Sequence, residues 1–81
     1  MTEKAFNEKC DRLLRFLKNN PETNWDIILI DTGIKKDDPV ISFLKEKGFV
    51  FFSNNELRIT VEGAAFISKT SFVEQVNKTV K

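Results

Sequence analysis

The chain has 81 residues, of which 41% are hydrophobic and 31% charged, and its net charge is +1. These values predict one globular domain over residues 1–81 with one compact core, because a domain this small buries only a little over ~60% of its unfolded surface. Thirteen Lys and Arg against twelve Asp and Glu provide no bulk attraction for nucleic acid. Any such affinity has to come from a local patch.

The residue types that are missing exclude most kinds of metal site and catalytic site. The sequence has no His and no Tyr, and Cys10 is its only cysteine. A structural zinc site needs four Cys or His ligands, and nucleophilic pairs of the Ser–His or Cys–His type need a His. We therefore expect no metal, no cofactor and no enzymatic activity. Cys10 is interpreted as a small buried residue on an apolar helix face.

Cysteine usage and hydropathy also bear on location. A lone cysteine forms no internal disulfide, which is typical of a reducing compartment. The longest apolar runs, such as Ile27–Ile30, are far shorter than the roughly 20 residues that span a bilayer. Residues 2–9 lack the apolar segment of a signal peptide. The sequence therefore predicts a cytoplasmic protein that has no contact with a membrane.

An amphipathic helix is predicted over residues 3–19. Apolar side chains recur there with a period of about 3.6 residues, and charged residues fill the opposite face. The helix ends before Pro21, because proline disfavours helical geometry in the residue that precedes it. The apolar positions are Phe6, Cys10, Leu13, Leu14 and Leu17.

A short second helix is predicted from Trp25 to about Asp31. Thr23 and Asp26 have the spacing of a reciprocal capping pair, and Gly33 is suited to ending the helix. The apolar run Ile27–Ile30 is rich in β-branched residues, so periodicity alone leaves a strand open as an alternative.

A third helix is predicted to begin after Asp38 and to end at Gly48. Asp38 is a favourable N-cap, and Pro39 suits the first helical position, where its missing N–H costs nothing. Val40, Phe43 and Leu44 form the apolar face of this helix. Gly48 is expected to adopt the left-handed conformation that closes a helix.

After Gly48 the apolar period changes to 2, which predicts a β-hairpin. Residues 49–52 and 57–61 form its strands, and residues 53–56 form a tight turn in which asparagines tolerate positive φ. Thr60 then caps a short helix that extends to Ser68. The fold class is therefore mainly α with a small antiparallel hairpin, an α+β arrangement.

The segment 71–81 is predicted to be a C-terminal helix that packs on a partner or on its own chain. Ser71 and Glu74 have capping-box spacing, but about ten residues do not form a stable helix alone in water. A second copy of the chain would give a homodimer, and the alternative is the first helix of the same chain. The candidate interaction residues are Phe52, Phe72, Val73, Val76 and Val80.

The expected core draws on every element before the last helix. Its predicted members are Phe6, Leu13, Leu14, Leu17, Ile28, Val40, Phe43, Leu44, Leu57 and Ile59. Trp25 is interpreted as an anchor at the start of its helix. The run Phe49–Phe52 is richer in aromatic residues than one buried hairpin face needs, so at least one of its rings should be exposed.

Four segments, in this order, resemble the winged helix–turn–helix family. Leu13–Leu17 is similar to the first helix of that family, and Trp25–Ile34 to its second helix and turn. Val40–Val50 resembles the third helix with its closing glycine and aliphatic residue. Ile59–Phe66 looks like the "I/L-T-x-x-G-x-x-F/L" ending of many winged-helix regulators. The resemblance covers about residues 10–68.

This resemblance implies a transcription regulator that binds DNA. In such proteins the third helix enters the major groove and the hairpin, or wing, touches the DNA backbone or the minor groove. The positions so presented are Lys35, Lys36, Ser42, Lys45, Lys47, Asn54, Asn55 and Arg58. Two features depart from the pattern: Asp37 and Asp38 stand where they would repel phosphate, and Arg58 is the only Arg beyond the first helix. A protein-interaction or dimerisation module on the same fold is therefore the alternative function.

Overall fold

The structure is a computed structural model that describes residues 2–79, with the side chains of residues 2–75. The described part is mainly helical and contains a two-stranded antiparallel hairpin, as the change of period predicts. In chain order the elements are α1 (Glu3–Asn19), α2 (Trp25–Thr32), α3 (Pro39–Glu46), β1 (Val50–Ser53), β2 (Glu56–Ile59), α4 (Val61–Lys69) and α5 (Phe72–Thr79).

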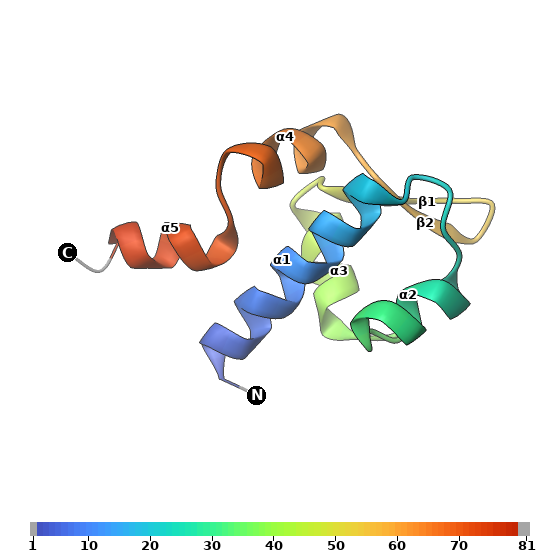
Figure 1. Ribbon diagram of the computed structural model, residues 1–81, viewed down its shortest axis with the longest axis horizontal. Coiled ribbons are helices and arrows are strands. Elements are labelled where there is room, and N and C mark those ends of the chain that lie inside the picture. Colours follow the sequence, from blue (N-terminus) through green and yellow to red (C-terminus); the bar gives the residue numbers. More distant parts are fainter. Residues whose placement is uncertain (1, 80–81) are drawn as a thin grey trace.

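Helix α1 runs through the middle of the molecule (Figure 1). In that view α2 and the hairpin lie on one side of it, α5 lies on the other, and α4 lies near its C-terminal end. The other helices and β2 all contact α1, which places its apolar stripe at the centre of the core. The predicted bounds of this helix, residues 3–19, are confirmed.

The segment Trp25–Thr32 is a helix and not a strand. The residue that caps it differs from the prediction. Asn24, and not Thr23, is the N-cap: its Oδ1 accepts the N–H of Ile27 at 3.0 Å. Thr23 is buried, and its carbonyl accepts a hydrogen bond from Arg58 of β2 at 2.7 Å. This tertiary bond holds the backbone at Thr23 against the hairpin, and the Thr23 hydroxyl is buried without a hydrogen-bond partner instead of capping α2. At the other end Gly33 has φ +75°, as expected for a closing glycine.

The hairpin pairs Val50 with Ile59 and Phe52 with Leu57. Asn54 and Asn55 form its two-residue turn with φ values of 53° and 65°, which confirms the predicted turn chemistry. The register places these four paired residues on one face and Phe51 on the other. The strands begin and end within one or two residues of the predicted bounds.

Close packing of α4 against the residue before β1 explains the Ile59–Phe66 motif physically. The Thr60 hydroxyl accepts the N–H of Gly63 and donates to the Gly48 carbonyl, which joins the helix cap to the end of α3. A Cβ on Gly63 would lie 2.3 Å from the carbonyl oxygen of Phe49. The rings of Phe49 and Phe66 stack with centroids 4.8 Å apart. Thr60, Gly63 and Phe66 of the motif therefore all serve the packing of α4 against residues 48 and 49.

The first turn of α5 packs against α1 of the same chain. Both oxygens of Asp11 accept backbone hydrogen bonds, from Phe72 at 2.8 Å and from Val73 at 3.2 Å. Ser71 accepts the N–H of Glu74 at 3.0 Å, which confirms the Ser71 half of the predicted capping box; the Glu74 carboxylate instead accepts the Thr70 hydroxyl at 3.3 Å. Phe72 was predicted as a candidate for interaction with a partner. It is only 8% exposed, because its ring packs in the core of its own chain.

Of the two other interaction candidates in this segment, Val80 lies outside the described residues, and Val76 outside those whose side chains the structure describes. Val73 is half-buried beside Asp11. The described turn of α5 thus follows the alternative in which the helix packs on its own chain, and the homodimer stays a prediction.

The core contains most of the predicted residues, but three of them are less buried than predicted. Phe6, Phe43 and Ile59 are half-buried and pack against the edge of the core. Phe6 and Phe43 meet edge to face with centroids 5.3 Å apart, where α1 and α3 approach the surface. The buried apolar residues are Cys10, Leu13, Leu14, Leu17, Ile28, Ile34, Val40, Ile41, Leu44, Val50, Leu57, Ile67 and Phe72.

Cys10 is fully buried on the apolar stripe of α1, as predicted. Burial first, and then the charges of Asp11 and Asp38, raise the pKa of its thiol to about 12. The thiol therefore stays protonated at neutral pH and serves as a small core side chain.

Replacing Gly63 by alanine should lower the free energy of unfolding by about 1–3 kcal/mol, because the new Cβ overpacks the contact with the Phe49 carbonyl. Chemical denaturation measures the loss. Ser68→Ala, an exposed change in the same helix, is the control and should change stability by less than about 0.5 kcal/mol. Equal stability of Gly63→Ala and the parent would contradict the close approach.

Candidate functional site

A half-buried tryptophan at the start of α2 holds the hairpin in place. Trp25 Nε1 donates a hydrogen bond to the carbonyl oxygen of Asn55, in the hairpin turn, at 2.5 Å. Its ring lies beside that of Phe52 of β1, with centroids 6.0 Å apart. Phe52 remains 42% exposed, so the pair forms an aromatic surface between α2 and the hairpin.

Two lysines from other parts of the chain cover this aromatic surface. Lys36, in the loop before α3, places its Nζ 5.8 Å from the centroid of Trp25. Lys45 of α3 places its Nζ 5.0 Å from the centroid of Phe52. Within the described residues neither lysine forms an ion pair with a carboxylate. We call Trp25, Lys36, Lys45 and Phe52 the lysine–aromatic cluster.

The cluster brings several predicted site residues together. Lys36, Lys45 and Phe52 belong to it, and the turn residue Asn55 touches it through its carbonyl. Three other candidates are exposed near these elements but have no described contact with the cluster: Lys35, Ser42 and Asn54.

Two predicted site residues point elsewhere. Lys47 places its Nζ 5.5 Å from the ring of Phe43, which lies against Phe6 and Phe72 on another side of the core. Arg58 is half-buried, and its Nη1 donates to the carbonyls of Thr23 and Leu57. Its guanidinium therefore fastens β2 to the start of α2.

The sequence analysis did not predict the contacts of Trp25 with the hairpin. The residue follows a helix cap, which favours an anchor, and its partner Asn55 lies 30 positions later. The available signal was the dense run Phe49–Phe52, which predicts an exposed ring. Nothing in the local pattern indicates that this ring meets Trp25.

The acidic start of α3 is largely compensated by α1. Asp38 accepts the N–H of Val40 as the predicted N-cap and also pairs with the Lys9 ammonium of α1. Burial alone would raise the pKa of Asp38, but the hydrogen bonds from Lys9 and Val40 and the Lys9 charge hold it below its ordinary value of 3.8. Asp37 remains exposed beside it.

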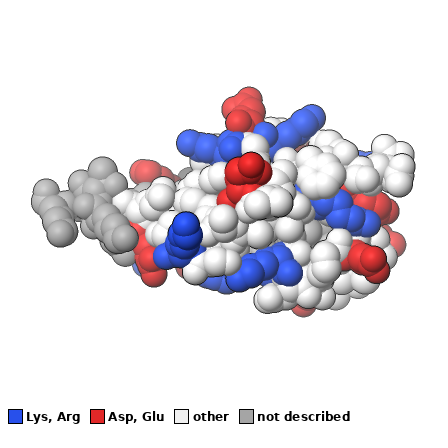
Figure 2. Space-filling model, turned by 90° about the horizontal axis from the view of Figure 1, so that it is seen from above, with Lys and Arg blue, Asp and Glu red and all other residues white. Residues whose placement is uncertain are grey.

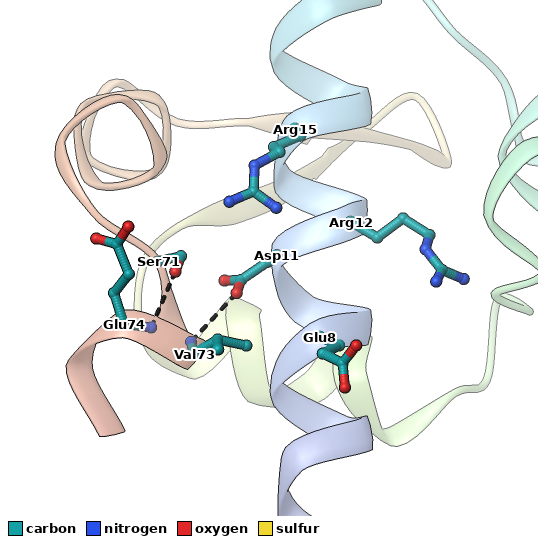
Figure 3. A pocket seen from close by; sticks show the side chains of 7 residues that line it. All are labelled: Glu8, Asp11, Arg12, Arg15, Ser71, Val73 and Glu74. Atoms are coloured by element: carbon teal, nitrogen blue, oxygen red, sulfur yellow. Dashed lines mark hydrogen bonds between the residues drawn. The ribbon is translucent and has the colours of Figure 1, made fainter. Parts of the chain in front are cut away.

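An open groove of about 500 Å³ lies between α1 and α5 (Figure 3). Arg15 extends towards α5 and Asp11, whereas Arg12 points away from them on the other side of α1. The Asp11 carboxylate and the Ser71 hydroxyl already accept backbone hydrogen bonds from α5. The buried polar groups of the groove therefore hold α5 in place and leave no paired nucleophile and base in it.

The charges on the face shown in Figure 2 are mixed. Lys and Arg side chains are interspersed there with Asp and Glu, and no patch of one sign covers that face. Within residues 2–79 there is no group of three or more Cys, Asp or Glu side chains placed to hold a metal ion. No described helix is both long and apolar enough to cross a membrane.

Comparison with known proteins adds no relative: no family model, no curated protein and no solved structure matches this chain.

Removing the Asp38 carboxylate should change how stability depends on pH. Because its pKa is lower in the folded protein, Asp38 contributes stability above about pH 3.8 that is lost as the pH falls further. Asp38→Asn should therefore be less stable than the parent at neutral pH, and the difference should shrink in acid. Thermal melts between neutral pH and pH 3 measure it. Asp37→Asn, the exposed neighbour, is the control; an identical pH profile for the two variants would contradict the pairing with Lys9.

Replacing Asp11 by alanine should loosen α5 from α1. The amides of Phe72 and Val73 would lose their acceptor, at a cost of about 1–3 kcal/mol in the free energy of unfolding. Denaturation measures the loss, and hydrogen exchange at these two amides should quicken. Glu8→Ala, an exposed acidic residue on the same helix, should leave both unchanged. Slow exchange retained in Asp11→Ala would exclude this docking contact.

Proposed function

We propose that the chain is a DNA-binding protein of the winged helix–turn–helix type, in which α2 and α3 form the helix–turn–helix and the hairpin is the wing. The observation that carries the proposal is the position of Lys45 of α3 over Phe52 of the hairpin. It brings an exposed lysine of α3 next to the hairpin, which supports simultaneous contact of both elements with one DNA duplex.

The chemistry of this surface suits phosphate contacts better than base reading. Lys36 and Lys45 are exposed cations without carboxylate partners in the described chain, and Ser42 is an exposed donor on α3. Arg58, the residue type best suited to reading guanine, is occupied with the Thr23 carbonyl. We therefore expect modest affinity and little sequence preference.

The pairing of Asp38 with Lys9 weakens the main objection to DNA binding. An unpaired carboxylate at the start of α3 would repel phosphate. Asp38 instead has the Lys9 ammonium beside it and the Val40 N–H on its other oxygen. Asp37 alone keeps an exposed negative charge at this point.

A protein-interaction module is the second candidate, and exposed apolar residues on α2 favour it. Ile30 is 84% exposed, and Ile27 and Leu29 are nearly half exposed. Large apolar side chains exposed on one short helix are compatible with a protein contact there. The mixed charges of Figure 2 are compatible with this candidate as well.

Fluorescence anisotropy with a random DNA duplex at low salt tests the proposal. With about three to five phosphates neutralised, the slope of log K against log salt should lie near −3 to −5. Lys36→Ala combined with Lys45→Ala should weaken binding to every duplex alike, because these lysines contact phosphate.

The matched control is Lys4→Ala combined with Lys18→Ala, which removes the same charge from exposed positions on α1. Equal weakening by the two double variants would show nonspecific attraction and contradict the proposed surface. Absence of binding at tens of micromolar protein would favour the protein-interaction module.

A further inference from the structure

We infer that the lysine–aromatic cluster binds unpaired nucleotides, with a base stacked on the exposed ring of Phe52 beside Trp25 and the flanking phosphates on Lys36 and Lys45. The inference rests on the proposed function and narrows it: the preferred nucleic acid has a single-stranded segment beside its duplex.

The exposure of Phe52 is not explained by its place in the hairpin. The register puts it on the same face as Val50 and Leu57, which are both buried. Phe52 lies next to the turn and is paired with buried Leu57, and its described ring contacts are Trp25 and Lys45. An aromatic ring is thus held on the inward side of the hairpin while 42% of it stays open to solvent.

The order of groups across the cluster fits a single strand. Contacts run from Lys36 to Trp25, from Trp25 to Phe52 and from Phe52 to Lys45, so two cations flank two rings. A nucleic-acid strand likewise places a phosphate on either side of each base. Proteins that bind single strands combine basic grooves with aromatic stacking platforms in this way.

The lysines do not block stacking. A cation–π contact at an exposed site is weaker than the stacking of a base on an aromatic ring, so an incoming strand can displace the ammonium groups. Each displaced ammonium then gains a phosphate. A base inside a duplex is already stacked and offers only its edge, so an unpaired base is the ligand that uses the rings.

Phe51 provides a matched comparison within the same strand. It is 43% exposed, nearly the same as Phe52, but it lies on the opposite face of the hairpin. No described lysine lies over its ring, and it has no described contact with Trp25. Substitutions at the two positions therefore remove similar apolar surface and differ in the contact tested.

Trp25 makes the experiment direct, because it is the only tryptophan and the chain has no tyrosine. Its fluorescence is followed during titration with a blunt DNA duplex and with the same duplex carrying an overhang of about six thymidines. We expect quenching by the overhang probe and a Kd about tenfold lower than for the blunt duplex. Phe52→Leu should abolish this preference, and Phe51→Leu should retain it.

The outcomes separate this inference from the proposed function. Equal affinity for the two probes, or a preference that survives in Phe52→Leu, overturns the inference and leaves duplex binding standing. Absence of binding to either probe overturns both. Thermal melts verify that both variants are folded, and Lys45→Gln, which leaves both rings in place, should weaken binding while keeping the preference.

Discussion

Burial of the apolar stripe of α1 is the interaction on which the rest of the structure depends. Leu13 and Leu14 have no exposed surface, and every other helix contacts α1. Two charged residues beside buried Cys10 then fix the orientation of the neighbours. Lys9 pairs with Asp38 at the start of α3, and Asp11 caps the start of α5. Apolar burial supplies the driving force in a domain this small, and these directional contacts select one arrangement.

Polar contacts place the hairpin in addition to its two core residues. Of its strand residues only Val50 and Leu57 are buried, and a two-stranded hairpin alone is marginal in water. Arg58 fastens β2 to the Thr23 carbonyl, and Trp25 fastens the turn through Asn55. Both contacts are made by residues at the start of α2, Thr23 and Trp25. The position of the hairpin relative to α2 and α3 therefore depends on residues 23–25. The lysine–aromatic cluster is a consequence of the same contacts.

Features governed by nearby residues could be predicted from the sequence, and features governed by distant contacts could not. The caps at Asp38 and Thr60 and the Asn54–Asn55 turn depend on residues within a few positions, and all are confirmed. The prediction of Thr23 as the cap of α2 was wrong: this residue is buried and its carbonyl is bound by Arg58, 35 positions away, which the local pattern does not indicate. Exposure of an aromatic ring in Phe49–Phe52 was predictable from composition. The contacts of the exposed ring of Phe52 with Trp25 and Lys45 could be found only from the structure.

A protein with a net charge of +1 can bind nucleic acid only through groups whose charge is not already satisfied. Lys9 is engaged by Asp38, whereas Lys36 and Lys45 rest on aromatic rings. At an exposed site such a contact contributes about 0.5–1 kcal/mol, less than the ~1–3 kcal/mol of one base stacked on an aromatic side chain. A strand displaces two such contacts, about 1–2 kcal/mol together, and in return gains the stacking of a base and a phosphate for each displaced ammonium. A duplex that offers phosphates alone has to displace the same contacts without the stacking. On this reasoning the rings, and not the net charge, decide which nucleic acid the proposed surface prefers.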